Sequence, residues 1–295
     1  MSGDSPIPKL RLAPRESLDD MIHRQERIQR AEHLQKEADL ENSLAPFRVG
    51  TVPFLNGVPL TRGLEEQVIY ETPARLAEML RRDELDAALV SITEVLLNDR
   101  YDVLDGIAIA SLGEVLSVLL AHRPPLEEIR DIYCDPASLT SVNLLKVLLA
   151  ERGLHPRFQP LEDYGAAAQK DAVLLIGDKA LEFLLASHPH QIWDLGAAWM
   201  EWTGKPFVYA VWALRRGIEN ERLRRLLREA RAFGMETLDY IIANRTEFTY
   251  PFRKDYLTWH LHYHLGADEK AGIARFAELL QKHGLGPVYP VRYVY

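Results

Sequence analysis

The chain has 295 residues, of which 47% are hydrophobic and 26% are charged, a balance typical of a globular protein. Its formal net charge of -8 argues against a nucleic-acid-binding surface, which needs clustered Lys and Arg. The single cysteine, Cys134, excludes an internal disulfide and a thiolate cluster for zinc or iron–sulfur binding, and it indicates a reducing compartment.

The chain shows no sign of export or membrane insertion. Its first residues contain no continuous apolar stretch of the signal-peptide type. Its apolar runs, such as 115–121 with one serine inside, are far shorter than the ~20 residues that span a bilayer. We therefore expect a cytoplasmic protein with neither a membrane nor a nucleic acid as partner.

Residues 1–46 differ from the rest of the chain. Residues 17–44 are rich in Glu, Arg, Gln and Asp, and their apolar residues form only a thin helical stripe. Ser17 with Asp19 and Asp20 suits the start of a helix, since acidic groups favour the positive end of the helix dipole. We predict a solvated helix lying on its own body. The alternative is an oligomerisation helix, which would make a homodimer.

From residue 47 onward, short apolar strands alternate with amphipathic helices. The predicted strands are 48–52, 68–71, 87–90, 107–110, 115–122, 131–134, 172–176, 192–194 and 207–214. The predicted helices are 59–64, 73–82, 92–97, 139–151, 179–185, 197–202, 219–244 and 268–283. This alternation predicts the α/β class, with a mostly parallel sheet covered by helices on both faces.

Two long apolar strands divide this part of the chain. The strands 115–122 and 207–214 flank a compact α/β stretch, and long strands suit crossovers between lobes. We therefore expect one lobe from 47–122 and 207–295, and a second, inserted lobe from 123–206. Ligands in such folds bind at the carboxyl ends of strands, where loops and helix N-termini meet.

Two polar residues stand in the predicted cleft-forming turns of the first half. Asn56 lies in a turn shaped by Pro53, Gly57 and Pro59, where its amide can donate and accept hydrogen bonds toward a ligand. The alternative is a turn-forming or helix-capping role. Ser117 lies within an apolar strand, where its hydroxyl needs a partner. A purely structural serine is the alternative there.

Two strand-to-helix junctions predict anion binding. Ser138, Thr140 and Ser141 follow a strand and begin a helix, whose free N–H groups and hydroxyls suit an anion. Plain capping by Ser138 is the alternative. A second strand turns at Gly177 into a helix that begins near Asp178. Capping explains Asp178 as well as ligand binding does.

Other features give weaker signals. His260, His262 and His264 would lie on one face only if their segment were a strand, and the flanking residues look helical or loop-like. We therefore expect no metal site. The chain has no glycine-rich phosphate loop and no dinucleotide-binding fingerprint. Four tryptophans within twenty residues, 193–212, predict mainly core packing, with one or two walling a ligand cleft.

Taken together, these segments resemble the chorismate dehydratases of the futalosine route to menaquinone. The matching segments are RVGTVPFLNGVPL (48–60), TPARLAEMLRRDELDAALV (72–90), GEVLSVLL (113–120), SLTSVNLLKVLL (138–149), LLIGDKAL (174–181) and DLGAAWMEWTGKPFVYAVW (194–212). The likeness covers about 47–285 and leaves the N-terminal extension outside. The last segment is the most specific, because a run of that length and composition rarely arises by chance.

The resemblance implies a periplasmic-binding-protein type 2-like fold, with two lobes around a ligand cleft. It also implies conversion of chorismate, a small dianion, into 3-[(1-carboxyvinyl)oxy]benzoate and water without a metal or an organic cofactor. Asn56 and Ser117 match the catalytic positions. Ser138, Thr140 and Ser141 match ligands of the substrate carboxylates, and the Gly177–Asp178 junction belongs to the same binding site.

Asn56 and Ser117 are poor bases at neutral pH, so we expect them to orient the substrate and to donate hydrogen bonds. The side-chain carboxylate of the substrate is then the expected base. Three positions depart from the family pattern: Glu114 replaces proline, Leu139 replaces arginine and Lys179 replaces alanine. Without the arginine, the positive charge would come from Lys179 or Lys205.

Two other functions fit the same fold. One is a non-catalytic binding protein for small carboxylates, and the other is a related enzyme with a different carboxylate substrate. The naphthoate synthase of the same pathway is one such enzyme, but its cysteine-proline-asparagine-aspartate segment is missing here. Fold alone does not separate these functions, and the motifs favour the dehydratase.

Overall fold

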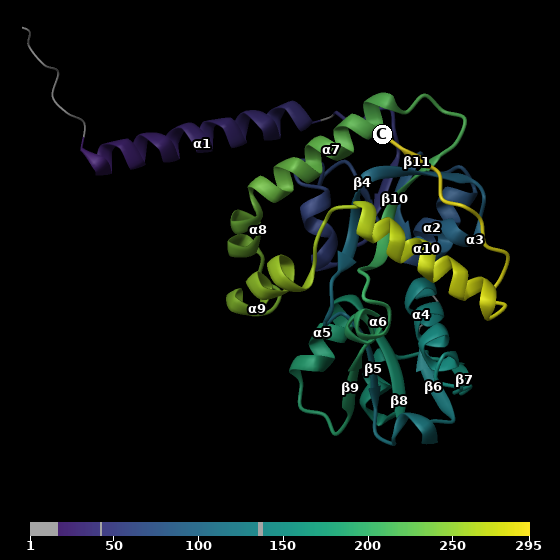
Figure 1. The fold of residues 1–295 in the computed structure, drawn as a ribbon. Helices are drawn as coiled ribbons and strands as arrows, with labels where there is room; N and C mark the ends of the chain where they lie inside the picture. Colours follow the sequence, from purple (N-terminus) through teal and green to yellow (C-terminus); the bar gives the residue numbers. More distant parts are fainter. Residues whose placement is uncertain (1–16, 42, 135–137) are drawn as a thin grey trace, which may run out of the picture. The chain divides into compact units, whose positions relative to one another are not determined.

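The computed structural model describes residues 17–41, 43–134 and 138–295. The chain divides into two compact units, Met1–Asp39 and Leu40–Tyr295. The described part of the first unit is the helix α1 (Leu18–Leu40), whose last residue belongs to the second unit (Figure 1). The Ser17 hydroxyl oxygen accepts the Asp20 N–H at 3.1 Å, which confirms the predicted helix start. The solvated-helix and oligomerisation interpretations both stay predictions.

The second unit contains a six-stranded sheet that forms most of the first lobe. Its strand order is β11-β4-β10-β3-β1-β2. The strands are β1 (Val49–Thr51), β2 (Ile69–Tyr70), β3 (Ala87–Ser91), β4 (Tyr101–Ser111), β10 (Phe207–Arg215) and β11 (Tyr293–Val294). β1 runs parallel to β2 and β3, whereas β10 runs antiparallel to β3 and β4. The strands β2 and β11 are two-residue edge strands that shield the sheet ends.

A five-stranded sheet forms the second lobe, in the order β7-β6-β8-β5-β9. Its strands are β5 (Val118–His122), β6 (Asp131–Cys134), β7 (Arg157–Pro160), β8 (Ala172–Ile176) and β9 (Gln191–Asp194). β6 runs parallel to β7 and β8, and β5 runs antiparallel to β8 and β9. The sheets are therefore mixed, because the strands that follow the two crossings, β5 and β10, enter antiparallel to their neighbours.

The lobe boundary differs from the expected one. β5 pairs with β8 and β9, so residues 118–122 belong to the second sheet and not to the first lobe. The chain crosses between the sheets at 112–117, where Gly113 has a φ of 108° and Leu116 a φ of 60°. These left-handed residues end the extended backbone. The apolar run 115–122 is thus a crossing segment followed by a strand. The sequence pattern predicted one continuous strand because both parts are apolar.

Helices surround both sheets (Figure 1). They are η1 (Leu55–Leu60), α2 (Pro73–Arg81), α3 (Ile92–Leu97), η2 (Leu126–Glu128), α4 (Leu139–Ala150), η3 (Tyr164–Gln169), α5 (Gly177–Leu185), α6 (Leu195–Thr203), α7 (Glu221–Glu236), α8 (Leu238–Asn244), α9 (Tyr250–Asp255), η4 (Tyr256–His260) and α10 (Ala267–Lys282). The predicted helix 219–244 is divided at Thr237, whose hydroxyl donates to the Phe233 carbonyl at 2.7 Å. The predicted helix 59–64 is instead the short 3-10 helix η1, which ends at Leu60.

The hydrophobic core explains why the lobes are held together. One large cluster includes residues of both sheets, among them Val90 of β3, Leu120 of β5 and Leu145 of α4. A smaller cluster lies on the other face of the second sheet and includes Leu119 and Leu175. Successive residues of β5 thus enter different clusters, as expected for a strand buried on both faces. No helix in the described part of the chain is both long and apolar enough to span a bilayer.

Candidate functional site

A cavity lies where residues of the two sheets and their helices meet. The empty space within it, including solvent at its mouth, is about 650 Å³. The lining residues are Val52, Phe54, Asn56, Pro73, Leu89, Ser91, Ile109, Val115, Ser117, Val118, Ser138, Leu139, Thr140, Ser141, Ile176, Gly177, Tyr209, Ala210 and Leu261. Among these described residues, no side chain is an acid, a lysine, an arginine or a histidine.

The structure brings six of the seven predicted site residues to this one cavity. Asn56 comes from η1, Ser117 from the crossing before β5, and Gly177 from the start of α5. The other three, Ser138, Thr140 and Ser141, come from the start of α4. The seventh, Asp178, is absent from the lining, although its neighbour Gly177 is part of it.

Asn56, Ser117 and Tyr256 form what we call the Asn56 group. The Asn56 Oδ1 and the Tyr256 hydroxyl are buried and have no hydrogen-bond partner among the residues that the structure describes. Burial raises the pKa of Tyr256, and the nearby side chains of Ser117 and Asn56 lower it, so the three side chains face one another although, within the described chain, no contact of the Tyr256 hydroxyl or the Asn56 Oδ1 has the distance and angle of a hydrogen bond. Because most buried polar atoms in proteins are paired, unpaired atoms beside a cavity indicate a place for a ligand. A turn-forming or capping asparagine would accept a backbone hydrogen bond with its Oδ1, and the Asn56 Oδ1 accepts none from the described residues. That alternative role is therefore wrong.

Ser91, Thr93 and Thr140 form a second set, the Thr140 group. The Thr140 hydroxyl is in hydrogen-bond contact with the Ser91 hydroxyl. It donates to the Thr93 hydroxyl at 3.1 Å and accepts the Thr93 N–H at 3.2 Å. Ser91 and Thr93 stand at the junction of β3 and α3, whereas Thr140 is the second residue of α4. The Thr140 group therefore joins the two lobes across the cavity with its hydrogen bonds already formed.

The start of α4 contributes the positive end of a helix dipole. Ser138 stands at the N-cap position but makes no side-chain capping bond, and its buried Oγ has no partner within the described chain. The expected alternative, plain capping by Ser138, is therefore wrong. The first N–H groups of a helix have no partner within the helix, so this end of α4 suits an anion. Residues 135–137, which precede it, lie outside the described residues.

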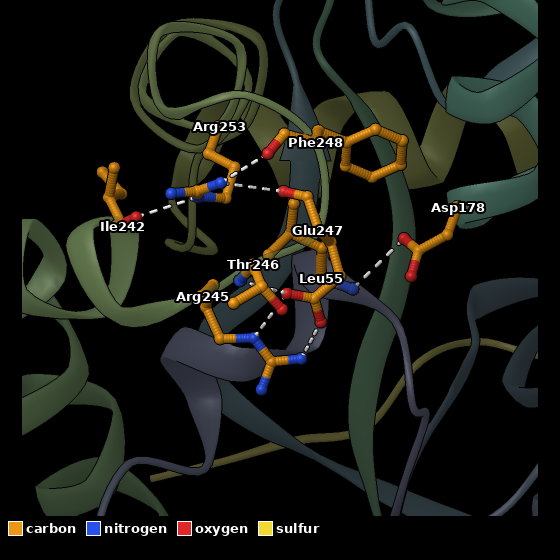
Figure 2. Close-up of polar contacts among 8 residues, drawn as sticks. All are labelled: Leu55, Asp178, Ile242, Arg245, Thr246, Glu247, Phe248 and Arg253. Atoms are coloured by element: carbon orange, nitrogen blue, oxygen red, sulfur yellow. Dashed lines mark hydrogen bonds and ion pairs between the residues drawn. The ribbon is translucent and has the colours of Figure 1, made fainter.

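Asp178 links the lobes beside the cavity. Its Oδ1 accepts the Leu55 N–H at 3.2 Å, so a carboxylate of α5 contacts the first residue of η1 (Figure 2). It does not cap its own helix, which contradicts the capping interpretation. Burial raises the pKa of Asp178, and the Leu55 N–H opposes this rise. The carboxylate thus acts as an inter-lobe acceptor next to the site.

The segment 245–249 near this link is held in a strained conformation. The buried Arg253 donates to the carbonyl of Ile242 at 2.9 Å, of Glu247 at 3.1 Å and of Phe248 at 2.6 Å (Figure 2). Phe248 has a φ of 61°, which a bulky side chain rarely adopts. Arg253 compensates by satisfying three carbonyl groups at once. The segment between α8 and α9 is therefore fixed by one arginine.

Sequence analysis missed Tyr209 and Tyr256, which come from β10 and η4. The Tyr209 hydroxyl lies 3.0 Å from the Ser111 hydroxyl, and burial raises the pKa of this tyrosine well above its usual value. Nothing in the local sequence marks either tyrosine, because an aromatic residue in an apolar strand or helix usually packs in a core. Only the fold brings Tyr209 to the cavity and Tyr256 to Asn56 and Ser117.

Asp194 was also missed, although its sequence context offered a signal. Its carboxylate accepts the N–H groups of Val115, Leu116 and Ala197, at 3.1, 2.8 and 2.9 Å respectively. It therefore caps α6 and also holds the left-handed Leu116 just before Ser117. An Asp directly before a predicted helix is a common N-cap, so the sequence could have predicted that Asp194 caps α6. It could not have predicted the contacts to Val115 and Leu116.

The predicted replacement for the family arginine is wrong. The Lys179 Nζ donates to Glu182 at 2.7 Å on the exposed side of α5, and neither Lys179 nor Lys205 lines the cavity. Leu139 itself is part of the cavity wall. The polar groups that this cavity offers are hydroxyl and amide groups and the N–H groups at the start of α4.

Three potential metal ligands meet outside the cavity. His262 forms an isolated bridge with Ala110 and is therefore extended, whereas His260 ends η4. His262, His264 and Glu269 bring one ligand atom each to within 4.8 Å of one another. The expectation that these histidines do not gather is thus wrong for two of the three.

Sequence comparison finds relatives over most of the chain. The sequence model of a family described as menaquinone biosynthesis matches residues 47–282. A chorismate dehydratase of Thermus thermophilus is 33% identical over 262 residues, covering 80% of this chain and 96% of that protein. A chorismate dehydratase of Campylobacter jejuni is 28% identical over 231 residues, covering 76% of this chain and 89% of that protein.

Solved structures show the same fold at low sequence identity. A protein of Archaeoglobus fulgidus has a TM-score of 0.67 at 20% identity, covering 81% of this chain and 98% of that one. The periplasmic aliphatic sulphonate-binding protein of Escherichia coli has a TM-score of 0.56 at 15% identity, covering 84% and 93%. The predicted periplasmic-binding-protein-like fold is confirmed, and with the match over most of its length the chain belongs to the menaquinone-biosynthesis family that includes the chorismate dehydratases.

Proposed function

We propose that this protein is a hydro-lyase that removes water from chorismate and releases 3-[(1-carboxyvinyl)oxy]benzoate. The observation that carries the proposal is the convergence of unpaired, buried polar atoms on one cavity. Asn56 and Ser138 line it, and the Asn56 Oδ1 and the Ser138 Oγ are buried without a partner among the described residues. The two curated relatives that act on chorismate by name support the choice of substrate.

The cavity would bind the dianion chorismate through neutral dipolar groups, since its described lining has no charged side chain. The N–H groups at the start of α4, with the hydroxyls of Ser138 and Ser141, would bind a carboxylate of the dianion. The apolar wall, which includes Leu89, Ile109 and Leu139, would hold the ring. This arrangement fixes orientation with little competition from water, and positioning of this kind lowers a barrier by about 7–11 kcal/mol at its upper range.

The reaction breaks one C–H bond and one C–O bond on neighbouring ring carbons. The proton at the carbon bearing the enolpyruvyl ether leaves, its electron pair forms the new ring double bond, and the neighbouring hydroxyl departs. The product is aromatic, so the forward direction is strongly favoured. Tyr209 is the ionisable side chain among the described lining residues, and burial raises its pKa. We therefore assign the proton transfer to the side-chain carboxylate of the substrate.

The Asn56 group would assist the leaving hydroxyl. The Asn56 side-chain NH₂ and the buried hydroxyls of Ser117 and Tyr256 are neutral donors that lie close together. Donors fixed before the reaction stabilise the charge that develops as the C–O bond breaks. The hydroxide takes the abstracted proton and leaves as water, so no proton is lost or gained overall. No residue has to change its charge in this scheme.

We also place the protein in the cytoplasm, where its single thiol, that of the buried Cys134, would stay reduced. A homodimer through residues 1–46 remains part of the proposal from the sequence. No metal or organic cofactor enters the scheme, because groups of the substrate and of the cavity carry each of its steps. Nucleic acids and membranes are not among the proposed partners.

The test is to incubate the purified full-length protein with chorismate and to quantify substrate and product by absorbance and mass. Protein-dependent formation of 3-[(1-carboxyvinyl)oxy]benzoate with loss of one water is the expected result. Chorismate that binds but is recovered unchanged would identify a non-catalytic carboxylate-binding protein. Absence of binding would mean that the cavity takes another carboxylate, and a panel of related acids would then be tested.

A further inference from the structure

A compact set of imidazole and carboxylate groups lies apart from the cavity lining. His262 and His264 belong to the segment that joins η4 to α10, and Glu269 lies in the first turn of α10. Their ligand atoms all lie within 4.8 Å of one another. The proposed dehydration does not use any of these side chains, so the cluster needs its own explanation.

The distances within the cluster are close to those of a metal site. The His262 Nε2 lies 3.1 Å from the Glu269 Oε1, and the His264 Nε2 lies 3.3 Å from the same oxygen. The two imidazole centroids are 4.5 Å apart. Zinc ligands at about 2.0–2.1 Å from a tetrahedral ion are roughly 3.3 Å from each other. Small side-chain rotations would therefore admit an ion between the three atoms.

The backbone holds two of the three ligands in place. His262 exchanges both backbone hydrogen bonds with Ala110, at 3.1 and 2.9 Å, so it is fixed to the end of β4. The Glu269 Oε2 accepts the Gly266 N–H at 2.7 Å, which leaves its Oε1 facing the imidazoles. Such support of a ligand by a second hydrogen bond is common in metal sites and orients the donor atom.

The charge of Glu269 also points to a cation. Its side chain is 4% exposed, and within the described residues its ion-pair partners are the two histidines alone. A buried carboxylate normally has a permanent positive partner or binds a metal. The start of α10 and the Gly266 N–H supply only partial charges.

We propose that His262, His264 and Glu269 bind one divalent ion of the zinc class. Two imidazoles and one carboxylate favour a late first-row metal over Mg²⁺ or Ca²⁺, which prefer oxygen ligands. The His264 side chain is 56% exposed, so the site is open to solvent on one side. That opening is the entry path and leaves a fourth position for water.

The ion would have a structural effect on the cavity wall. Leu261 lines the cavity and directly precedes His262, and His262 pairs with Ala110 next to Ser111. An ion bound to His262 and Glu269 would therefore tie this wall to α10. The inference does not depend on which substrate the cavity takes.

The experiment uses the full-length protein after treatment with a chelator. Calorimetric titration with ZnCl₂ should give one equivalent bound, and Co²⁺ should give the visible absorption of a four-coordinate site. His264→Ala should weaken Zn²⁺ binding about tenfold or more, since even loss of an outer partner changes metal affinity by about 10–100-fold. His264→Cys should retain binding, because a thiolate is also a zinc ligand.

His283→Ala is the matched control. His283 also contacts a carboxylate, Glu151 at 2.6 Å, but Lys282 is the other partner there instead of a second histidine. This variant should bind Zn²⁺ like the wild type. Zn²⁺ should raise the melting temperature of wild type and control, but not of His264→Ala. Failure of the wild type to bind one equivalent, or equal binding by His264→Ala, would overturn the proposal.

Discussion

The Asn56 group and the Thr140 group border the same cavity but use their hydrogen bonds differently. In the Asn56 group, the Asn56 Oδ1 and the Tyr256 hydroxyl have no partner among the described residues. In the Thr140 group, one hydroxyl contacts Ser91 and Thr93 of the other lobe. Atoms without partners are available to a ligand, whereas atoms already paired hold the structure together. We therefore propose chemistry for the first group and lobe positioning for the second.

The largest expected effect comes from the unpaired group. Asn56→Ala should lower kcat on chorismate by about 100- to 1000-fold, the usual result of removing one fixed donor from a developing charge. Its melting temperature should change little, because the lost Oδ1 has no partner in the described structure. Steady-state kinetics and thermal unfolding measure the two effects. As a control, Asn244→Ala, on an exposed face of α8, should leave kcat and the melting temperature unchanged. Full activity of Asn56→Ala would show that Asn56 has no part in the mechanism.

The tyrosine that sequence analysis missed gives the next largest effect. Tyr256→Phe removes only the hydroxyl and should lower kcat/KM by about ten- to a hundredfold, as expected for a hydrogen bond to a charged group. Tyr263 is the matched control, since its buried hydroxyl also lacks a partner in the described part of the chain, and the group member that affects its pKa is Tyr256 and not Asn56 or Ser117. Tyr263→Phe should retain activity. Equal losses in the two variants would mean that the effect is general to buried tyrosines and not specific to the site.

The paired group should respond in KM and in stability. Thr140→Val keeps the side-chain shape but removes the contacts to Ser91 and Thr93. Each lost bond costs about 1 kcal/mol of unfolding free energy, and a weaker lobe contact should raise KM by about five- to tenfold while kcat changes less. Thr203→Val, which loses a bond within α6, tests for a general effect of this substitution. A fall in kcat as large as that of Asn56→Ala would contradict the division between the groups.

The smallest expected effect is a pH-dependent change in folding stability caused by Asp178, whose carboxylate accepts the inter-lobe hydrogen bond. Burial raises the pKa of Asp178 in the folded protein. Above the ordinary carboxyl pKa of about 3.9, the folded state therefore binds more protons than the unfolded state, and this group lowers stability as the pH rises through the raised pKa. Asp178→Asn keeps an oxygen for the Leu55 N–H without the charge. Its stability relative to wild type should grow as the pH rises above 4.

Urea unfolding at a series of pH values measures this difference. Asp131 is the control with the opposite sign, because its hydrogen bond to Arg157 lowers its pKa. The wild type should gain stability over Asp131→Asn as the pH rises through that lowered pKa, and should hold this gain above 4. A wild type that also gains stability over Asp178→Asn would show that the Asp178 carboxylate is stabilised, and not penalised, in the folded protein.

The two groups also differ in how far sequence could predict them. Asn56, Ser117 and the Ser138–Ser141 segment stand at strand ends or helix starts, where local pattern shows polar atoms next to a predicted cleft. The strands and helices of the α/β fold follow from the same patterns. Tyr256 gave no such signal, because it lies more than a hundred residues from Ser117 and only tertiary contacts bring them together.

The errors at the lobe boundary and in the expected arrangement of the histidines have a common cause. Sequence pattern joined 115–122 into one strand because a left-handed Leu116 cannot be recognised from apolar residues alone. Likewise, the extended conformation at His262 depends on its pairing with Ala110, far away in the sequence. Long-range backbone pairing decides both places, and a local pattern does not contain it.

The most direct test of the account compares Asn56→Ala and Thr140→Val in one assay that measures both chorismate binding and product formation. If Asn56 acts in the chemical step, Asn56→Ala should bind chorismate within about tenfold of wild type but form product about 100- to 1000-fold more slowly. Thr140→Val should bind more weakly but turn over bound substrate at nearly the wild-type rate. Normal turnover by Asn56→Ala, or loss of turnover without loss of binding in Thr140→Val, would contradict the account.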